Sequence, residues 1–134
     1  MSEKDSDLVQ LGASDSTRRV LETLKDEGHI DTLLDGYRLG IATAIAFGKQ
    51  PRRSGGESRK TMFQTSSVDD DDRSLRTTIV EVFPEAASWP YRAAEDLAEQ
   101  GVGLIGESMD GDEIWFGDLL DRIRQANVGS TDAD

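Results

Sequence analysis

The chain has 134 residues, a formal net charge of −12 and no cysteine. Without cysteine there are no disulfides, thiolate zinc sites, thiol nucleophiles or iron–sulfur clusters. The length predicts one domain with a modest core, and the acidity opposes general binding to nucleic acid, because the field of the protein repels a polyanion. No apolar run is long enough for a signal peptide or a membrane span, so we expect a cytoplasmic protein with no membrane contact.

The two ends of the chain are polar. Residues 1–14 are rich in Ser and Asp and offer little to bury, so we predict a disordered acidic tail, and residues 128–134 have the same character. We expect residues 15–127 to fold as a single helical domain with a basic and acidic loop at 48–74.

Two helices are predicted in the first third of the domain. STRRVLETLKDEGH, residues 16–29, has an apolar face, and Gly28 can end it. IDTLLDGYRLGIATAIAFG carries apolar residues at helical spacing and ends at Gly48.

Gly36, Gly40 and Ala44 lie four residues apart in the second helix and form a seam with almost no side chain. A helical glycine costs about 1 kcal/mol relative to alanine, so close approach of another backbone is the expected compensation. We favour packing against another helix of the same core. A protein interface, with a homodimer along this seam, is the alternative.

The next segment, LRTTIVEVF (75–83), is ambiguous. Its β-branched run suits a strand, but its apolar stripe also fits a helix, and the aspartates at 69–72 can cap a helix there. We favour the helix, ended by Pro84.

Two more helices complete the domain. One begins with Pro90 in its first turn, continues through YRAAEDLAEQGVGLIGE, and is expected to loosen at the glycines near its end. The other closes the domain at 110–126. The predicted fold is a mostly α, compact single-domain bundle of about five helices, with one or two short strands allowed.

Three large aromatic residues of the C-terminal half, Trp89, Tyr91 and Trp115, are the candidate anchors of a protein interface. Core packing is the favoured interpretation. Exposed side chains among them would suit a partner surface.

A basic island, GKQPRRSGGESRK, stands out in this acidic chain. Its candidate contacts to nucleic acid or another anionic partner are Lys49, Arg52, Arg53, Arg59 and Lys60. A Walker-type phosphate loop is excluded, because Arg59 stands where that loop needs glycine before Lys60. A phosphate contact and a solvated loop without a ligand are equally open. Lys49, Arg52 and Arg53 are the favoured contacts, while Arg59 and Lys60 look more dispensable.

No enzyme signature is recognisable. Neighbouring side chains in the acidic run at 69–72 alternate in direction, so a helix start is favoured over a cation shell. The single histidine, His29, has no partners spaced for a catalytic triad. We therefore expect a non-enzymatic binding protein with no catalytic residue, metal or cofactor.

Two segments carry a resemblance to a known family. The matching positions are Gly48, Lys49, Pro51 and Arg52 after the apolar helix, and Ala94, Glu95, Leu97, Ala98 and Gly101 in the later helix. Over roughly residues 17–125 the pattern resembles the small accessory proteins associated with DNA phosphorothioation (Dnd) systems. The resemblance implies a non-enzymatic accessory subunit in prokaryotic anti-phage defence, with larger ATPase or nuclease subunits as partners. The SGGESRK insertion and the acidic run depart from that family's pattern.

Two other functions stay open. One is a small dimeric DNA-binding regulator that contacts phosphates through the basic island. The other is an antitoxin-like inhibitor whose acidic surface covers a basic site, as a DNA mimic would.

Overall fold

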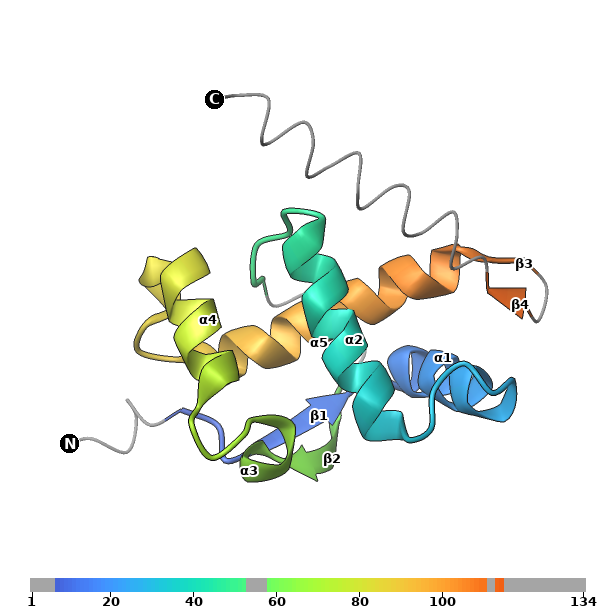
Figure 1. Ribbon diagram of the computed structural model, residues 1–134, viewed down its shortest axis with the longest axis horizontal. Helices are drawn as coiled ribbons and strands as arrows, with labels where there is room; N and C mark the ends of the chain where they lie inside the picture. The colour runs from blue at the N-terminus through green and yellow to red at the C-terminus, as the bar shows by residue number, and fades with distance from the viewer. Residues whose placement is uncertain (1–6, 53–57, 111–112, 115–134) are drawn as a thin grey trace.

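The structure is a computed structural model, and it describes residues 7–52, 58–110 and 113–114. Its elements are β1 (Gln10–Ala13), α1 (Asp15–Asp26), α2 (Leu33–Ala46), β2 (Lys60–Gln64), α3 (Thr65–Val68), α4 (Ser74–Val82), the 3-10 helix η2 (Pro84–Ala86), α5 (Pro90–Glu107), β3 (Met109–Asp110) and β4 (Glu113–Ile114). The prediction of a compact, mostly helical bundle with short strands is confirmed (Figure 1). None of the described helices is long and apolar enough to cross a membrane.

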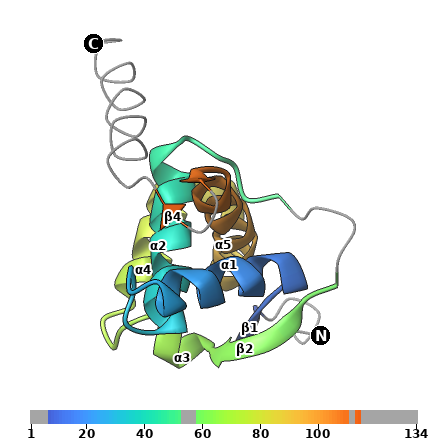
Figure 2. The ribbon, with the colours of Figure 1, turned by 90° about the vertical axis from the view of Figure 1, so that its right-hand side faces the viewer.

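The core is organised around the crossing of α2 and α5 at the centre of the molecule (Figures 1 and 2). A Cβ atom at Gly101 would lie 1.6 Å from the carbonyl oxygen of Gly40, so the two backbones touch where only glycine fits. Gly36 and Ala44 are buried as well. Packing of the small-residue seam against another helix of the same core is confirmed. The alternative of a homodimer along this seam is wrong, because atoms of the chain itself cover the seam.

The first turn of α5 is capped by a residue that is far away in the sequence. The carboxylate of Asp7 accepts hydrogen bonds from the backbone N–H groups of Tyr91 at 2.5 Å and Arg92 at 2.9 Å. A carboxylate at this position also meets the positive end of the helix dipole. The helix then continues to Glu107, so the predicted loosening at its glycines is wrong.

The N-terminal segment is part of the fold. β1 pairs antiparallel with β2 across a bulge, and its Leu11 is fully buried. The predicted tail at 1–14 is therefore wrong for residues 10–14, because the partner of β1 is a distant strand that no local pattern reveals. The loop predicted at 48–74 likewise contains β2 and α3. Residues 1–6 lie outside the described part of the chain.

The ambiguous segment 75–83 forms helix α4 as far as Val82, as favoured from the sequence. Asp69 accepts a hydrogen bond from the N–H of Leu75 at 3.0 Å, and Asp70 accepts one from the N–H of Ser74 at 2.9 Å. The hydrogen bonds from Ser74 lower the pKa of Asp70. Capping of this helix by the acidic run is confirmed.

The C-terminal predictions are only partly covered by the structure. Of the closing helix predicted at 110–126, residues 110 and 113–114 are described, and they belong to β3 and β4. The rest of that helix and the tail at 128–134 lie outside the described residues.

Candidate functional site

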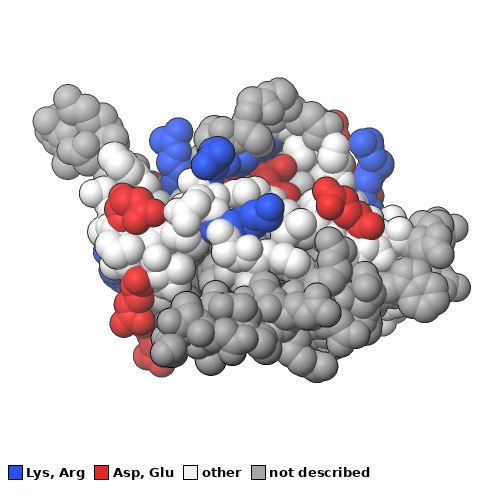
Figure 3. All heavy atoms as spheres, turned by 90° about the horizontal axis from the view of Figure 1, so that it is seen from above, with Lys and Arg blue, Asp and Glu red and all other residues white. Residues whose placement is uncertain are grey.

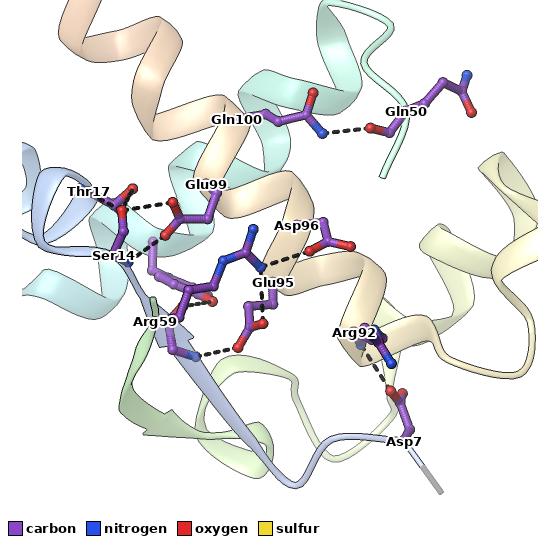
Figure 4. Close-up of polar contacts among 12 residues, drawn as sticks. Asp7, Ser14, Thr17, Gln50, Arg59, Arg92, Glu95, Asp96, Glu99 and Gln100 are labelled. Carbon is purple, nitrogen blue, oxygen red and sulfur yellow. Dashed lines mark hydrogen bonds and ion pairs between the residues drawn. The ribbon is translucent and has the colours of Figure 1, made fainter. Parts of the chain in front are cut away.

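Arg59, near the end of the basic island, lies inside the protein. Its Nη1 donates to Asp96 Oδ1 at 2.7 Å and to Glu95 Oε1 at 3.1 Å, and its side chain is 9% exposed (Figure 4). Burial disfavours the charged guanidinium, but the hydrogen bonds to Asp96 and Glu95 more than offset it, so the pKa of Arg59 is raised. The prediction of Arg59 as a dispensable contact for an anionic partner is wrong, because α5 already binds it. The neighbouring Lys60 is exposed.

The same acidic face of α5 holds β1. Glu95 Oε2 accepts from the N–H of Gly12 at 2.8 Å, and Glu99 Oε2 accepts from the N–H of Ser14 at 2.7 Å. The Ser14 hydroxyl donates to Glu99 Oε1 at 2.9 Å, and its oxygen accepts the N–H of Thr17 to cap α1. Two backbone donors at the edge of β1 are therefore satisfied by carboxylates of α5 (Figure 4).

Tyr37 connects α2 to this network. Its hydroxyl donates to the carbonyl oxygen of Gly12 at 2.9 Å, and its ring packs edge-on against Phe63 with 5.0 Å between centroids. Burial, together with the nearby carboxylates of Glu95 and Glu99, raises the pKa of Tyr37 far above its usual value. The neutral hydroxyl of Tyr37 thus ties α2 to β1.

We call this set the Arg59 network: Gly12, Ser14, Tyr37, Arg59, Glu95, Asp96 and Glu99. It ties α2, α5 and β1 to the residue that precedes β2. The carboxylates that would be the obvious candidates for acid–base chemistry here are bound by an arginine and by backbone donors. Across the described residues, no three His, Cys, Asp or Glu side chains gather as ligands for a metal ion.

Sequence reasoning missed the acidic half of this network, because acids are abundant in the chain. A usable signal was present in α5. Glu95 and Asp96 stand between Ala94 and Leu97, and both apolar neighbours are fully buried. A helix that is buried on both sides of two acids leaves them little contact with water, so they need a cation from elsewhere in the chain.

The opposite end of the basic island stays on the surface. Lys49 and Arg52 are exposed, and together with Gly48, Gln50 and Gln100 they line a hollow of about 250 Å³. We call it the basic hollow. Gln100 Nε2 donates to the carbonyl oxygen of Gln50 at 2.6 Å, which fastens this segment to α5 (Figure 4). The roles of Lys49 and Arg52 as contacts to a partner stay predictions, and Arg53 lies outside the described residues.

Trp89 is the exposed member of the predicted aromatic anchors within the described residues, at 40%. It lines a second hollow together with Pro51, Glu85, Ala86, Arg92, Ala93 and Asp96. Tyr91 is half-buried, and its hydroxyl donates to Asp69 at 2.6 Å. Burial and this hydrogen bond raise the pKa of Tyr91 to about 12. Trp115 is outside the described part of the chain.

The face of the molecule seen from above carries charges of both signs. Figure 3 shows Lys and Arg side chains interspersed with Asp and Glu side chains on this face. A continuous basic track is the usual footprint of a nucleic-acid surface. The visible described part of this face carries no such track.

No protein-family model matches this chain, and no curated protein or solved structure matches it. The resemblance to Dnd-associated accessory proteins therefore stays a prediction. What the protein binds has to be inferred from its own surface.

Proposed function

We propose that this protein is a non-enzymatic accessory subunit that docks onto a larger protein partner. The docking surface comprises the basic hollow and the Trp89 hollow. The two hollows adjoin, because Pro51 of the second lies between Gln50 and Arg52 of the first. One observation carries the proposal: the exposed Trp89 shares a hollow with Pro51, and Pro51 lies on the segment, fastened to α5, that carries the exposed cations Lys49 and Arg52.

The composition of this surface favours protein binding. Tryptophan and arginine are the residues most enriched at the energetic centres of protein interfaces, and Trp89 and Arg92 line the same hollow. A large aromatic side chain left 40% exposed contributes apolar area that a partner can remove from water. The surrounding charged side chains suit the polar rim of an interface.

The Arg59 network supports binding over catalysis. A general acid or base must present its proton-transferring atom to a substrate. Glu95 and Glu99 instead direct carboxylate oxygens at the backbone of β1, and Asp96 binds Arg59. The contacts of these three carboxylates thus have a structural explanation.

The resemblance described above names the partner to test, a larger ATPase or nuclease subunit of a DNA-modification-linked anti-phage defence system. Its matching positions divide into two kinds. Those in α5 are buried, as Ala94 and Gly101 are, whereas Lys49 and Arg52 are exposed. A shared pattern of this kind would preserve the fold and the surface segment that it presents.

Co-purification is the direct test. The protein is co-expressed with the ATPase and nuclease subunits of such a defence system, and complex formation is measured by size-exclusion chromatography. We expect a stable complex with the wild-type chain and at least a tenfold weaker one with Trp89→Ala, which truncates an interface anchor. Val9→Ala is the matched control, because Val9 is an exposed apolar residue, at 75%, that lines neither hollow.

The same proteins discriminate the alternatives. A salt-sensitive shift of duplex DNA by the isolated protein, lost in Lys49→Ala/Arg52→Ala, would support a DNA-binding regulator. Loss of activity on neutralising exposed acidic residues, with the docking surface intact, would support an inhibitor. Absence of any complex together with either result would overturn the accessory role.

A further inference from the structure

We propose that the basic hollow receives one acidic side chain of the protein partner, so that the partner presents an Asp or Glu next to the apolar group that covers Trp89. This inference rests on the proposed function and names the chemistry of the partner. Two exposed cations, Lys49 and Arg52, line the hollow, and none of the described residues that line it is acidic.

The chemistry of the lining selects an acceptor. Ammonium and guanidinium groups donate hydrogen bonds and cannot accept them. The Gln100 amide already uses one N–H for the carbonyl oxygen of Gln50. A ligand that complements Lys49 and Arg52 is therefore an acceptor-only group with negative charge, which describes a carboxylate.

The backbone around the hollow is held in place before a ligand arrives. The N–H of Gly48 donates to Ile45 at 3.0 Å and the N–H of Lys49 donates to Ala44 at 2.9 Å, both within the end of α2. Gln100 fixes Gln50 from the other side. Preorganisation of this kind reduces the ordering entropy that binding would otherwise cost.

The dipole of α2 disfavours an anion in the basic hollow, but its effect is smaller than that of the two cations. The hollow lies at the C-terminal end of α2, where the helix dipole amounts to roughly half a negative charge. Lys49 and Arg52 contribute two full positive charges. The local field therefore remains favourable to one carboxylate.

A protein acid fits this site better than a nucleic acid. The hollow of about 250 Å³ accommodates a single small group, whereas a duplex places phosphates at regular intervals along both strands. A polynucleotide would extend from the hollow over a chain of net charge −12 and would be repelled. A lone Asp or Glu on a partner avoids that repulsion. The adjoining Trp89 hollow supplies the apolar contact such a partner needs.

The site can be tested on the isolated protein by NMR. Sodium acetate, inorganic phosphate, a short Glu-containing peptide with one Leu, and a short duplex oligonucleotide are titrated separately at constant ionic strength. We expect saturable shifts of the Lys49, Arg52 and Gln100 resonances with acetate and the peptide. Lys49→Ala/Arg52→Ala should abolish them. Lys60→Ala is the control, because Lys60 is an exposed cation of the same island outside the hollow.

Each other outcome contradicts the inference. Shifts with the oligonucleotide and phosphate but not with acetate or the peptide would assign the hollow to nucleic acid. The absence of saturable shifts, or shifts that survive Lys49→Ala/Arg52→Ala, would remove the site.

A second arm uses the complex. Lys49→Ala/Arg52→Ala should weaken partner binding by roughly three- to tenfold, the range for two exposed ion pairs, and the loss should shrink at high salt. Equal binding by this variant, with Trp89→Ala still disruptive, would refute the acidic contact and leave the accessory role standing. The two proposals can thus fail separately.

Discussion

The two ends of one basic island have opposite fates in this protein. At one end, Arg59 is buried and bonded to Glu95 and Asp96 of α5. At the other end, Lys49 and Arg52 are exposed beside Gln100, one turn further along the same helix. The cations therefore differ by the residues of α5 next to them. Arg59 is buried where α5 carries carboxylates, whereas Lys49 and Arg52 stay exposed where it carries an amide. A run of like charges in a sequence need not act as one surface.

Removing Arg59 is the strongest way to break this contrast. Arg59→Met removes the cation that bonds the buried carboxylates of Glu95 and Asp96, and breaking a buried pair in this way costs about 3–5 kcal/mol. We expect urea unfolding to report that loss. The exposed neighbour provides the control, because Lys60→Met should change the free energy of unfolding by no more than about 0.5 kcal/mol.

A rescue variant separates charge burial from lost packing. Arg59→Met combined with Glu95→Gln and Asp96→Asn also neutralises the two carboxylates that Arg59 bonds, while keeping an acceptor for the N–H of Gly12. Neutral replacement of a buried ion pair is often tolerated, so we expect much of the stability to return. If the triple variant is as unstable as Arg59→Met, the network acts by shape and not by charge.

The next largest loss of stability is expected at the close contact between α5 and α2. A Cβ at Gly101 would overlap the backbone of Gly40, so we expect Gly101→Ala to destabilise the protein by about 1–3 kcal/mol or more. Gly103 has open space around its Cα, so Gly103→Ala should stabilise the helix by up to about 1 kcal/mol. Opposite signs in thermal unfolding would confirm the contact, whereas equal effects would contradict it.

Local patterns in the sequence were enough for α1, α2, α4 and α5 and for the small-residue seam, but not for α3. The spacing of Gly36, Gly40 and Ala44 predicted close helix packing. It did not identify the partner residue, Gly101 of α5. β1 could not be predicted, because it is held by β2 and by Glu95, which both lie far along the chain. Neither could the split of the basic island be predicted.

The reason is physical. Helix periodicity is a local property, whereas the burial of a charge depends on which residues the tertiary fold brings near it. Lys49 and Arg52 are exposed, as their predicted contact role requires, whereas Trp89 is 40% exposed although core packing was the favoured interpretation.

The burial of the two tyrosines should be measurable by alkaline titration. The chain has two tyrosines, and burial raises the pKa of both, to about 12 for Tyr91. Because an unfolded tyrosine titrates near pH 10, the stability that the neutral hydroxyls contribute is complete below about pH 10. It is lost as the pH rises from there through about 12, the pKa of Tyr91 in the folded protein.

Ultraviolet absorbance measures this directly. The folded protein should show little tyrosinate at about pH 10, whereas the urea-unfolded chain should be half-ionised there. Tyr91→Phe should remove the earlier of the two folded-state ionisations, because Tyr37 is the more deeply buried ring. Ordinary titration of either tyrosine near pH 10 in the folded state would contradict the hydrogen bonds to Gly12 and Asp69.

The smallest expected change is at the exposed end. Lys49→Ala/Arg52→Ala should alter the free energy of unfolding by no more than about 0.5 kcal/mol, because exposed side chains away from caps and buried pairs contribute little to stability. The same variant should lose acetate binding and weaken the partner complex, so function and stability separate at this end while they coincide at Arg59. If urea unfolding instead shows a loss as large as that of Arg59→Met, Lys49 and Arg52 belong to the fold. The distinction between the two ends of the island would then disappear.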